Sequence, residues 1–249
     1  MLKSFRDCNV RICASLLPHG LWEGRAYAIY NWVGLAHILD PDVHTILDVG
    51  AGRTWYFGPE VKQKRQFKLI GVDDDADEMA LNSCLDERTV GNASQSLGVP
   101  DGSIDLILSR ATLEHLPDNA GFLRCCSKAL VPGGRLVVVF TGKWAPSALL
   151  NRALPSRLAN KLLNLLVPGS KGQQGFHACY DKCSDTEFSR ELKKNGFEIV
   201  YKYHSYFASA YYMFFVPLYI LSIAIDYIRM ILSRRDLATM MLYVAKKPE

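Results

Sequence analysis

The chain has 249 residues, a hydrophobic content of 49% and a formal net charge of +4. This size and composition suit one α/β domain with additional segments, because such folds often reach this length undivided. An odd number of cysteines, seven, and a charged N-terminus without a long apolar core argue against a secreted, disulfide-stabilised protein. The sequence therefore predicts a cytoplasmic protein with reduced thiols, at most peripheral on the inner face of a membrane.

Residues 1–44 are expected to form an N-terminal helical cap. A helical pattern over 26–39 ends at Asp40-Pro41, a pair that stops helices. Tyr27 and Tyr30 lie in this run, where they either cover a ligand pocket or pack in the interior. A second unit, from 45 to 249, is predicted to follow the cap.

Residues 45–54 carry the most informative pattern of the chain. A short apolar run leads to Asp48 and then to Gly50 and Gly52, which predicts a buried strand that opens into a glycine turn. Glycine permits positive φ and lets a ligand approach the main chain closely. Such a turn also begins dinucleotide-binding and phosphate-binding sites, so the loop alone leaves the ligand open.

Further segments with buried, strand-like patterns follow the glycine turn. The predicted strands are 67–73, 89–93, 103–109 and 136–140, the last one preceded by a tight turn at 132–134, and a final pair is predicted at 197–203 and 240–246. Asp73 ends the second strand. A carboxylate at that tip is placed to accept both hydrogen bonds of a ribose diol, which indicates an adenosine ligand.

Five short motifs appear in a fixed order along this part of the chain. They are Leu-Asp-Val-Gly-Ala-Gly (47–52), Gly-Val-Asp (71–73), Gly-Asn-Ala (91–93), Leu-Glu-His-Leu (113–116) and Leu-Val-Pro-Gly-Gly-Arg-Leu (130–136). In these motifs the chain resembles the class I S-adenosylmethionine-dependent methyltransferases. The resemblance implies an α/β fold: a doubly wound, mostly parallel seven-stranded sheet with an antiparallel last strand and helices on both faces. It also implies S-adenosyl-L-methionine as cofactor and a methyltransferase domain over 45–249.

The resemblance also implies which residues bind the cofactor. They are Asp48, Gly50, Gly52, Asp73, Asp74, Asn92 and Ala93. The two glycines are expected to contact the methionine part, while Asp48 fixes the loop and the amino group. Asp73 is expected to hold the ribose, with Asp74 near the adenine. Asn92 stands where relatives often have Asp, and its amide oxygen is expected to accept from the adenine N6.

His115 is the candidate general base for a hydroxyl acceptor. It follows the fourth strand, on the side where substrates bind in open α/β sheets. Capping a helix or contacting the cofactor is an equally open role for this side chain. Glu114 is a weaker choice of base. His177 and Tyr180, in a later loop, either close over the acceptor or face solvent.

Two other function classes stay open. A nicotinamide-dependent oxidoreductase also uses a glycine turn and an acidic second strand, but the position of its third glycine holds Thr54 here. A non-catalytic module that binds an adenosyl cofactor would keep the pocket and lack a base. No metal is predicted, because His177, Cys179 and Cys183 are not accompanied by a second Cys pair.

The expected domain carries two insertions, near 145–170 and near 204–235. The first is leucine-rich and basic, and no acidic residue lies between Asp118 and Asp181. Its segment 156–166 faces an anionic substrate, a membrane surface or simply solvent. Nucleic acid is disfavoured as a partner, because the basic residues come with leucines rather than with base-stacking motifs.

The second insertion is apolar, and the chain has no Asp, Glu, Lys or Arg from Tyr203 to Ile225. This length would admit a transmembrane helix. A single crossing, however, would separate the last two strands of one sheet, and Pro217 divides the tract into pieces too short for two crossings.

Docking on a membrane surface through 204–235 is therefore the preferred interpretation of this tract. Arg229, Arg234 and Arg235 follow it and suit anionic headgroups. A lid over a hydrophobic substrate and a homodimer interface stay open as alternatives. The predicted acceptor is a small or lipid-linked molecule, methylated at a hydroxyl oxygen.

Overall fold

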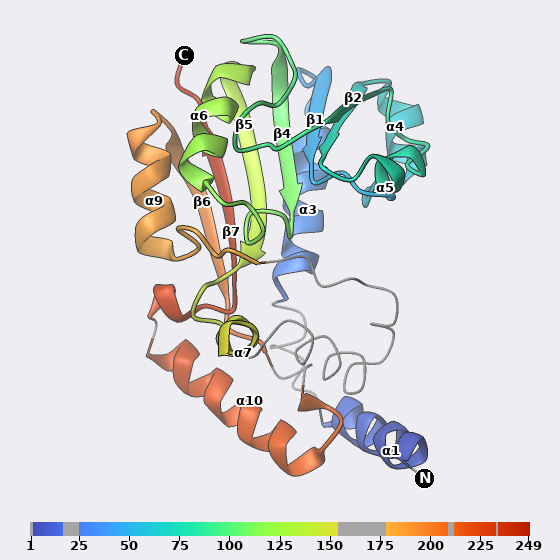
Figure 1. Cartoon of the computed structure of the whole chain (residues 1–249), viewed down its shortest axis with the longest axis vertical. Helices are drawn as coiled ribbons and strands as arrows, with labels where there is room; N and C mark the ends of the chain where they lie inside the picture. The colour runs from blue at the N-terminus through green and yellow to red at the C-terminus, as the bar shows by residue number, and fades with distance from the viewer. Residues whose placement is uncertain (1, 17–24, 154–177, 209–211, 233) are drawn as a thin grey trace.

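Figure 1 shows a computed structural model of the chain, which describes residues 2–16, 25–153, 178–208, 212–232 and 234–249. Its centre is one seven-stranded sheet in the order β3-β2-β1-β4-β5-β7-β6. The strands are β1 Thr45–Val49, β2 Lys68–Asp73, β3 Glu87–Val90, β4 Ile104–Arg110, β5 Leu130–Thr141, β6 Glu198–Ser205 and β7 Met240–Lys246. Only β7 runs antiparallel to its neighbours, β5 and β6. This topology confirms the predicted fold.

Helices cover both faces of the sheet. The described helices are α1 Leu2–Ser15, α3 Ala26–Ile38, α4 Pro59–Arg65, α5 Ala76–Ala80, α6 Asn119–Ala129, α7 Pro146–Ala153, α9 Asp185–Lys194, α10 Val216–Ile231 and the short 3-10 helix η2 Arg235–Leu237. One hydrophobic cluster takes side chains from α6 and α9, and a second, on the opposite face, takes side chains from α3 and α5.

The apolar run of β5 explains why the sheet is buried on both faces. Val138 and Phe140 join the first cluster, while the intervening Val137 and Val139 join the second. Successive side chains of a strand point to opposite faces, so a continuous β-branched run is suited to a sheet that is buried on both sides.

The boundary predicted between a cap and the following domain stays a prediction. α3 nevertheless shares one core with the sheet, since Tyr30 and Ile38 are fully buried beside Ile46 of β1. α1 instead lies against α10, where Asn9 Oδ1 accepts a hydrogen bond from the Val216 N–H at 3.0 Å.

The tight turn predicted at 132–134 is a bulge inside β5 rather than the start of the strand. Ile104 of β4 pairs with Leu130, and Leu106 pairs with Arg135, so the residues between Leu130 and Arg135 bulge out of the ladder. Gly133 adopts a φ of 80° there, which only glycine accepts without strain.

The apolar tract does divide at Pro217, because α10 begins at Val216 and the described residues before it are not part of this helix. Pro217 lies in the first turn of α10. Backbone N–H groups in the first turn have no acceptor within the helix, so the N–H that proline lacks costs no hydrogen bond there. Among the described residues, no helix combines the length and the apolar character needed to cross a bilayer. The basic segment 156–166 lies outside the described residues.

Candidate active site

The glycine turn after β1 is hydrogen-bonded to the end of β2. The Gly50 N–H donates to the carbonyl of Val72 at 2.8 Å, and the Gly52 N–H donates to Asp73 Oδ2 at 2.8 Å. Gly50 has a φ of 75°, and a Cβ added there would lie 1.9 Å from Thr112 Oγ1. The backbone at Gly50 therefore approaches the β4 side of the site as no other residue type could.

Asp48 is buried at the end of β1, with 7% of its surface exposed. Burial, helped by the negative charge of Asp73 and opposed by Arg110, raises the pKa of this carboxyl to about 7. A carboxyl whose pKa lies near neutrality favours a cationic group beside it, because such a group stabilises the ionised form.

Asp73 lies at the tip of β2, as predicted, and joins the two loops of the site. Its Oδ2 accepts from Gly52 and its Oδ1 accepts from the Asp75 N–H at 3.0 Å. Because a carboxylate offers about four lone-pair sites, two remain for a ligand diol. Partial burial raises the pKa of Asp73, while these two hydrogen bonds lower it.

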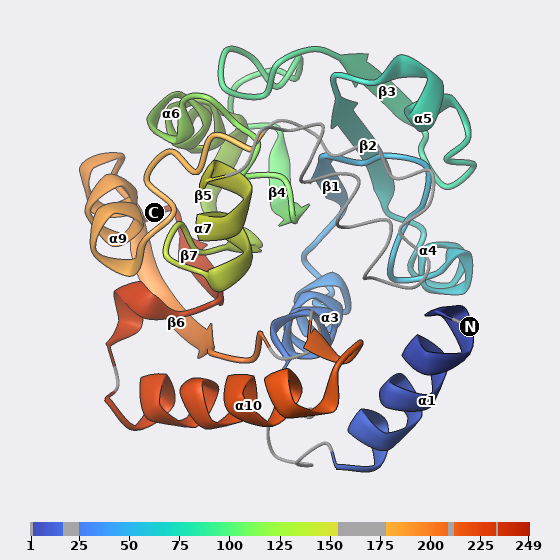
Figure 2. The same ribbon diagram turned by 60° about the horizontal axis from the view of Figure 1, so that its bottom comes forward.

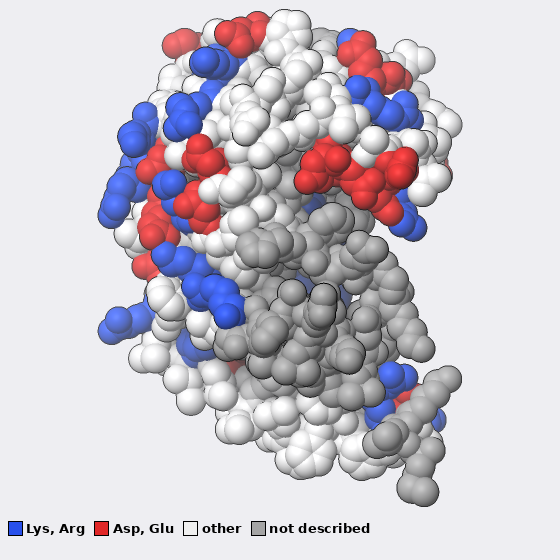
Figure 3. Space-filling view, viewed as in Figure 1, with Lys and Arg blue, Asp and Glu red and all other residues white. Residues whose placement is uncertain are grey.

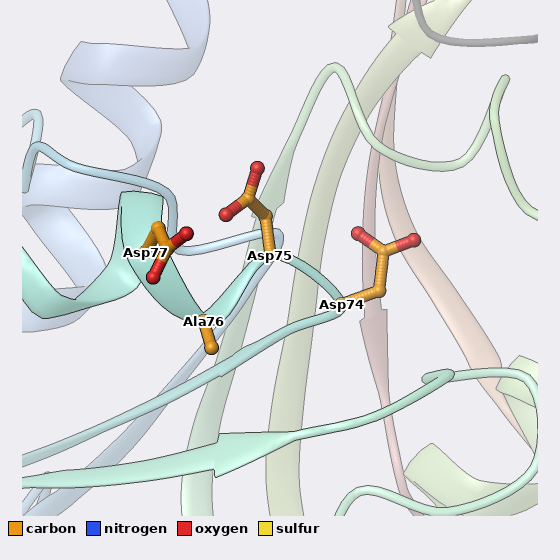
Figure 4. Close-up of a pocket in the computed structure, with 4 residues that line it drawn as sticks. All are labelled: Asp74, Asp75, Ala76 and Asp77. Carbon is orange, nitrogen blue, oxygen red and sulfur yellow. The ribbon is translucent and has the colours of Figure 1, made fainter.

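A pocket of about 330 Å³ lies beside this carboxylate. Figure 4 shows its lining, Asp74, Asp75, Ala76 and Asp77, which belong to the turn after β2 and to α5. Figure 3 shows the acidic side chains gathered on that part of the surface. Asp75 caps α5, since its Oδ1 accepts from the Glu78 N–H at 2.9 Å. Asp74 is exposed, so its carboxylate is accessible to a ligand.

Asn92 and Ala93 follow β3 at the same edge of the sheet. The amide oxygen of Asn92 accepts from the Ser94 N–H at 2.8 Å, which forms an Asx turn. One of its two lone pairs is thereby used. Asn92 is exposed and Ala93 is buried.

Asn82 supports the glycine turn, although no motif in the sequence singles it out. It is 1% exposed, and its amide nitrogen donates to the carbonyls of Ala51 and Gly52 at 3.2 and 3.3 Å. Its amide oxygen accepts from the Cys84 N–H at 3.2 Å. Asn82 therefore fixes the turn from outside.

Arg110 is a second residue that sequence reasoning missed. It ends β4, and its guanidinium lies between the rings of Tyr27 and Tyr56, 4.1 and 3.8 Å from their centroids. Such stacking holds a cation by its faces and leaves its edge free to donate. The Nε atom is buried and finds no hydrogen-bond partner among the described residues. The charge is close enough to lower the pKa of Asp48.

His115 lies in the turn between β4 and α6. Its backbone N–H donates to the carbonyl of Thr112 at 2.9 Å, and its side chain is half-buried. Because β1, β2 and β4 are parallel, this turn follows the same edge of the sheet as the glycine turn and Asp73. The structure thus brings His115 to the predicted end of the sheet.

Glu114 is part of the scaffold. It is 4% exposed, and its Oε1 accepts from the backbone and the hydroxyl of Thr141 at 3.2 and 2.7 Å. Burial raises the pKa of this carboxyl. The Glu114 carbonyl accepts from the N–H groups of Cys179 and Tyr180, so the later loop contacts this turn. His177 lies outside the described residues. Within the described part of the chain, no group of His, Cys, Asp and Glu is arranged to hold a metal.

The residues of this edge fit S-adenosylmethionine. A Cβ added at Gly52 would have no atom within 4 Å, so the main chain of the glycine turn is open to a ligand there. The carboxylates of this edge complement the cationic sulfonium and ammonium groups of the cofactor. They belong to Asp48, Asp73, Asp74, Asp75 and Asp77. Arg110 complements its carboxylate.

Comparison with known proteins agrees with this fit. Residues 22–202 match the family model of a methyltransferase domain. A trans-aconitate 2-methyltransferase from Azoarcus sp. (strain BH72) is 28% identical over 130 residues, which are 51% of this chain and 51% of that protein. A ubiquinone biosynthesis O-methyltransferase from Caulobacter sp. (strain K31) is 36% identical over 89 residues, 34% of this chain and 32% of the relative. The matches thus span about half of the first relative and about a third of the second.

The fold is shared more widely. The crystal structure of an S-adenosylmethionine-dependent methyltransferase from Mesorhizobium loti aligns with a TM-score of 0.56 at 18% identity, covering 87% of this chain and 97% of that chain. The family match covers most of the chain and sets aside the oxidoreductase alternative. The chain therefore belongs to the methyltransferase domain family.

Proposed function

We propose that the protein transfers a methyl group to a hydroxyl oxygen of a small or lipid-linked acceptor by in-line displacement. The observation that carries this proposal is the position of His115 at the sheet edge that also holds Gly50 and Asp73. The Caulobacter relative, named for O-methylation in ubiquinone biosynthesis, supports an oxygen acceptor with a hydrophobic part.

Each residue of the site has a role in this proposal. When bound, S-adenosylmethionine supplies the methyl group in electrophilic form. Asp73 binds the ribose diol through the lone pairs that Gly52 and Asp75 leave free, and Asp48 accepts from the amino group. The backbone at Gly50 and Gly52 contacts the methionine part, while Arg110 pairs with its carboxylate.

Asp74, Asn92 and Ala93 bind the adenine in this proposal. The free lone pair of the Asn92 amide oxygen accepts from the adenine N6, with Asp74 nearby and Ala93 packing against the ring. His115 orients the acceptor hydroxyl and takes its proton as the methyl group transfers. The rest of the catalytic gain comes from holding donor and acceptor in line and excluding water.

A lipid-linked acceptor would be presented at a bilayer. Peripheral membrane contact through 204–235, on the cytoplasmic face, is therefore part of the same proposal. The apolar tract from Tyr203 to Ile225, which contains no Asp, Glu, Lys or Arg, supports this contact.

Label transfer tests the proposal. Purified protein is incubated with methyl-labelled S-adenosylmethionine and with aqueous and organic extracts of cells, and labelled products are identified by mass spectrometry. His115→Ala should lower turnover by roughly a hundredfold while cofactor binding persists, whereas His44→Ala, an exposed histidine before β1, serves as the control.

Two outcomes would count against this function. A wild-type protein that binds the cofactor and labels no extract would be a non-catalytic adenosyl-binding module. Turnover that is unchanged in His115→Ala would show that this residue is not the base.

A further inference from the structure

α10 has its polarity reversed relative to an ordinary surface helix. Its buried residues are Tyr219, Ser222 and Asp226, whose spacing places them on one face. Asp226 is 1% exposed, and its Oδ2 accepts from the Ala208 N–H at 2.8 Å. The inward face of this helix therefore includes a carboxylate that the protein satisfies internally.

The outward face of α10 is apolar. Its exposed leucine and isoleucine side chains, which we call the docking face, are Ile220, Leu221, Ile225, Ile228 and Ile231, each between 43% and 76% exposed. No exposed residue of α10 is charged. Surface helices normally place such residues against the core, and a contiguous exposed apolar patch marks an interaction site.

α1 extends this apolar surface. The hydrogen bond from Val216 to Asn9 joins the start of α10 to α1. Phe5 and Ile12 of α1, and Leu16 directly after it, are 43% to 55% exposed. Figure 2 shows the two helices adjoining along one outer edge of the molecule.

The docking face lies at the end of the molecule that also carries the candidate site (Figure 1). β6 is antiparallel to β7, as β5 is, so β6 ends at the same sheet edge as β1 and β4. The chain leads from Ser205, at the end of β6, into α10. Figure 1 accordingly draws α10 beyond the carboxyl ends of the strands.

The charges around the docking face complement an anionic surface. Arg234 and Arg235 follow α10 and are exposed, and Arg11 is exposed on α1. Arg229 is not available for this purpose, because its guanidinium donates to Thr239 Oγ1 at 3.2 Å and to the Leu237 carbonyl. Apolar residues beside exposed arginines are typical of helices that lie on anionic bilayers. The acid of α1, Asp7, is paired with Arg6 at 3.0 Å.

We propose that α10 lies flat on an anionic lipid bilayer, with the docking face immersed between the headgroups and the exposed apolar side chains of α1 beside it. A helix of 16 residues then extends about 24 Å along the surface without crossing it. The inference deepens the proposed function, on which it rests for the lipid-linked acceptor, by naming the surface that presents this acceptor to the sheet edge.

Vesicle flotation tests the docking face. Wild-type protein should float with phosphatidylcholine vesicles that contain phosphatidylglycerol, and less with phosphatidylcholine alone. The triple variant Leu221→Ser, Ile225→Ser, Ile228→Ser should lose about tenfold or more of the bound fraction, because three immersed side chains are removed. The control replaces Leu39, Val200 and Tyr201, exposed apolar residues elsewhere, by Ser and should float as the wild type does.

Stabilisation by S-adenosylhomocysteine is measured on the same samples, and it should persist in both triple variants. A wild type that is stabilised by this ligand but does not float with anionic vesicles overturns the docking proposal and leaves the methyltransferase site intact. Equal flotation of the docking-face variant overturns it too. A wild-type dimer that this variant dissociates, without flotation, assigns the face to a second copy of the chain.

Discussion

Asp48→Asn should stabilise the protein above neutral pH. The carboxyl is buried at the end of β1, where ionisation is opposed by burial and by Asp73. Its pKa is raised, so the folded state binds this proton more tightly than the unfolded chain does. The stability that the protonated group contributes is complete below the unfolded pKa near 4 and is lost as the pH rises through about 7.

The magnitude follows from the shift. A rise from 3.8 to about 7 is roughly three pH units, and each unit corresponds to about 1.36 kcal/mol, so the ionised form costs on the order of 4 kcal/mol. Asparagine keeps the shape and cannot ionise. The free energy of unfolding of Asp48→Asn minus that of the wild type should therefore be near zero at pH 4 and approach this value at pH 8.

Urea unfolding between pH 4 and pH 8 measures this difference. Asp101→Asn, in the exposed turn before β4, is the control and should change the free energy of unfolding by about 0.5 kcal/mol or less. A difference for Asp48→Asn that stays flat across the pH range would refute the assignment of a buried, proton-binding carboxyl at this position.

Three further substitutions test the site. Gly50→Ala should cost about 2 kcal/mol or more in urea unfolding, because its Cβ meets Thr112, whereas Gly102→Ala has a similar φ of 62° with no atom within 4 Å and should cost less. Asn82→Ala should cost about 1–3 kcal/mol and weaken cofactor binding in titrations, since three hydrogen bonds are lost, two of them to the glycine turn. Arg110→Met should raise the pKa of Asp48, followed by carboxyl NMR, because a nearby positive charge is removed.

Much of the fold was predictable because its signals are local. The run before Gly50 and the β-branched run of β5 each indicate a buried strand, and Asp73 marks a strand tip by its position alone. The bulge at Gly133 was not predictable, because the same residues form a turn unless β4 and β7 pair around them.

The remainder depends on contacts between distant segments. Arg110 gains its place only when α3 and the loop after β1 bring Tyr27 and Tyr56 to its two sides. For α10, periodicity predicts two faces but not which one is buried. The face with Asp226 is the buried one, where this carboxylate accepts a hydrogen bond from the distant Ala208 N–H. The roles of His115 and of the cofactor-binding residues stay predictions.

Titration of S-adenosylhomocysteine into the wild type and into Asp73→Ala, with a nicotinamide dinucleotide as the comparison ligand, tests the central claim most directly. The adenosyl ligand should bind the wild type and, at a hundred times its dissociation constant, stabilise it by about 2.7 kcal/mol. Asp73→Ala should bind at least about tenfold more weakly, because the ribose loses its acceptor. The dinucleotide should not bind. Equal affinity of both proteins for S-adenosylhomocysteine, or tighter binding of the dinucleotide, would contradict the assigned site.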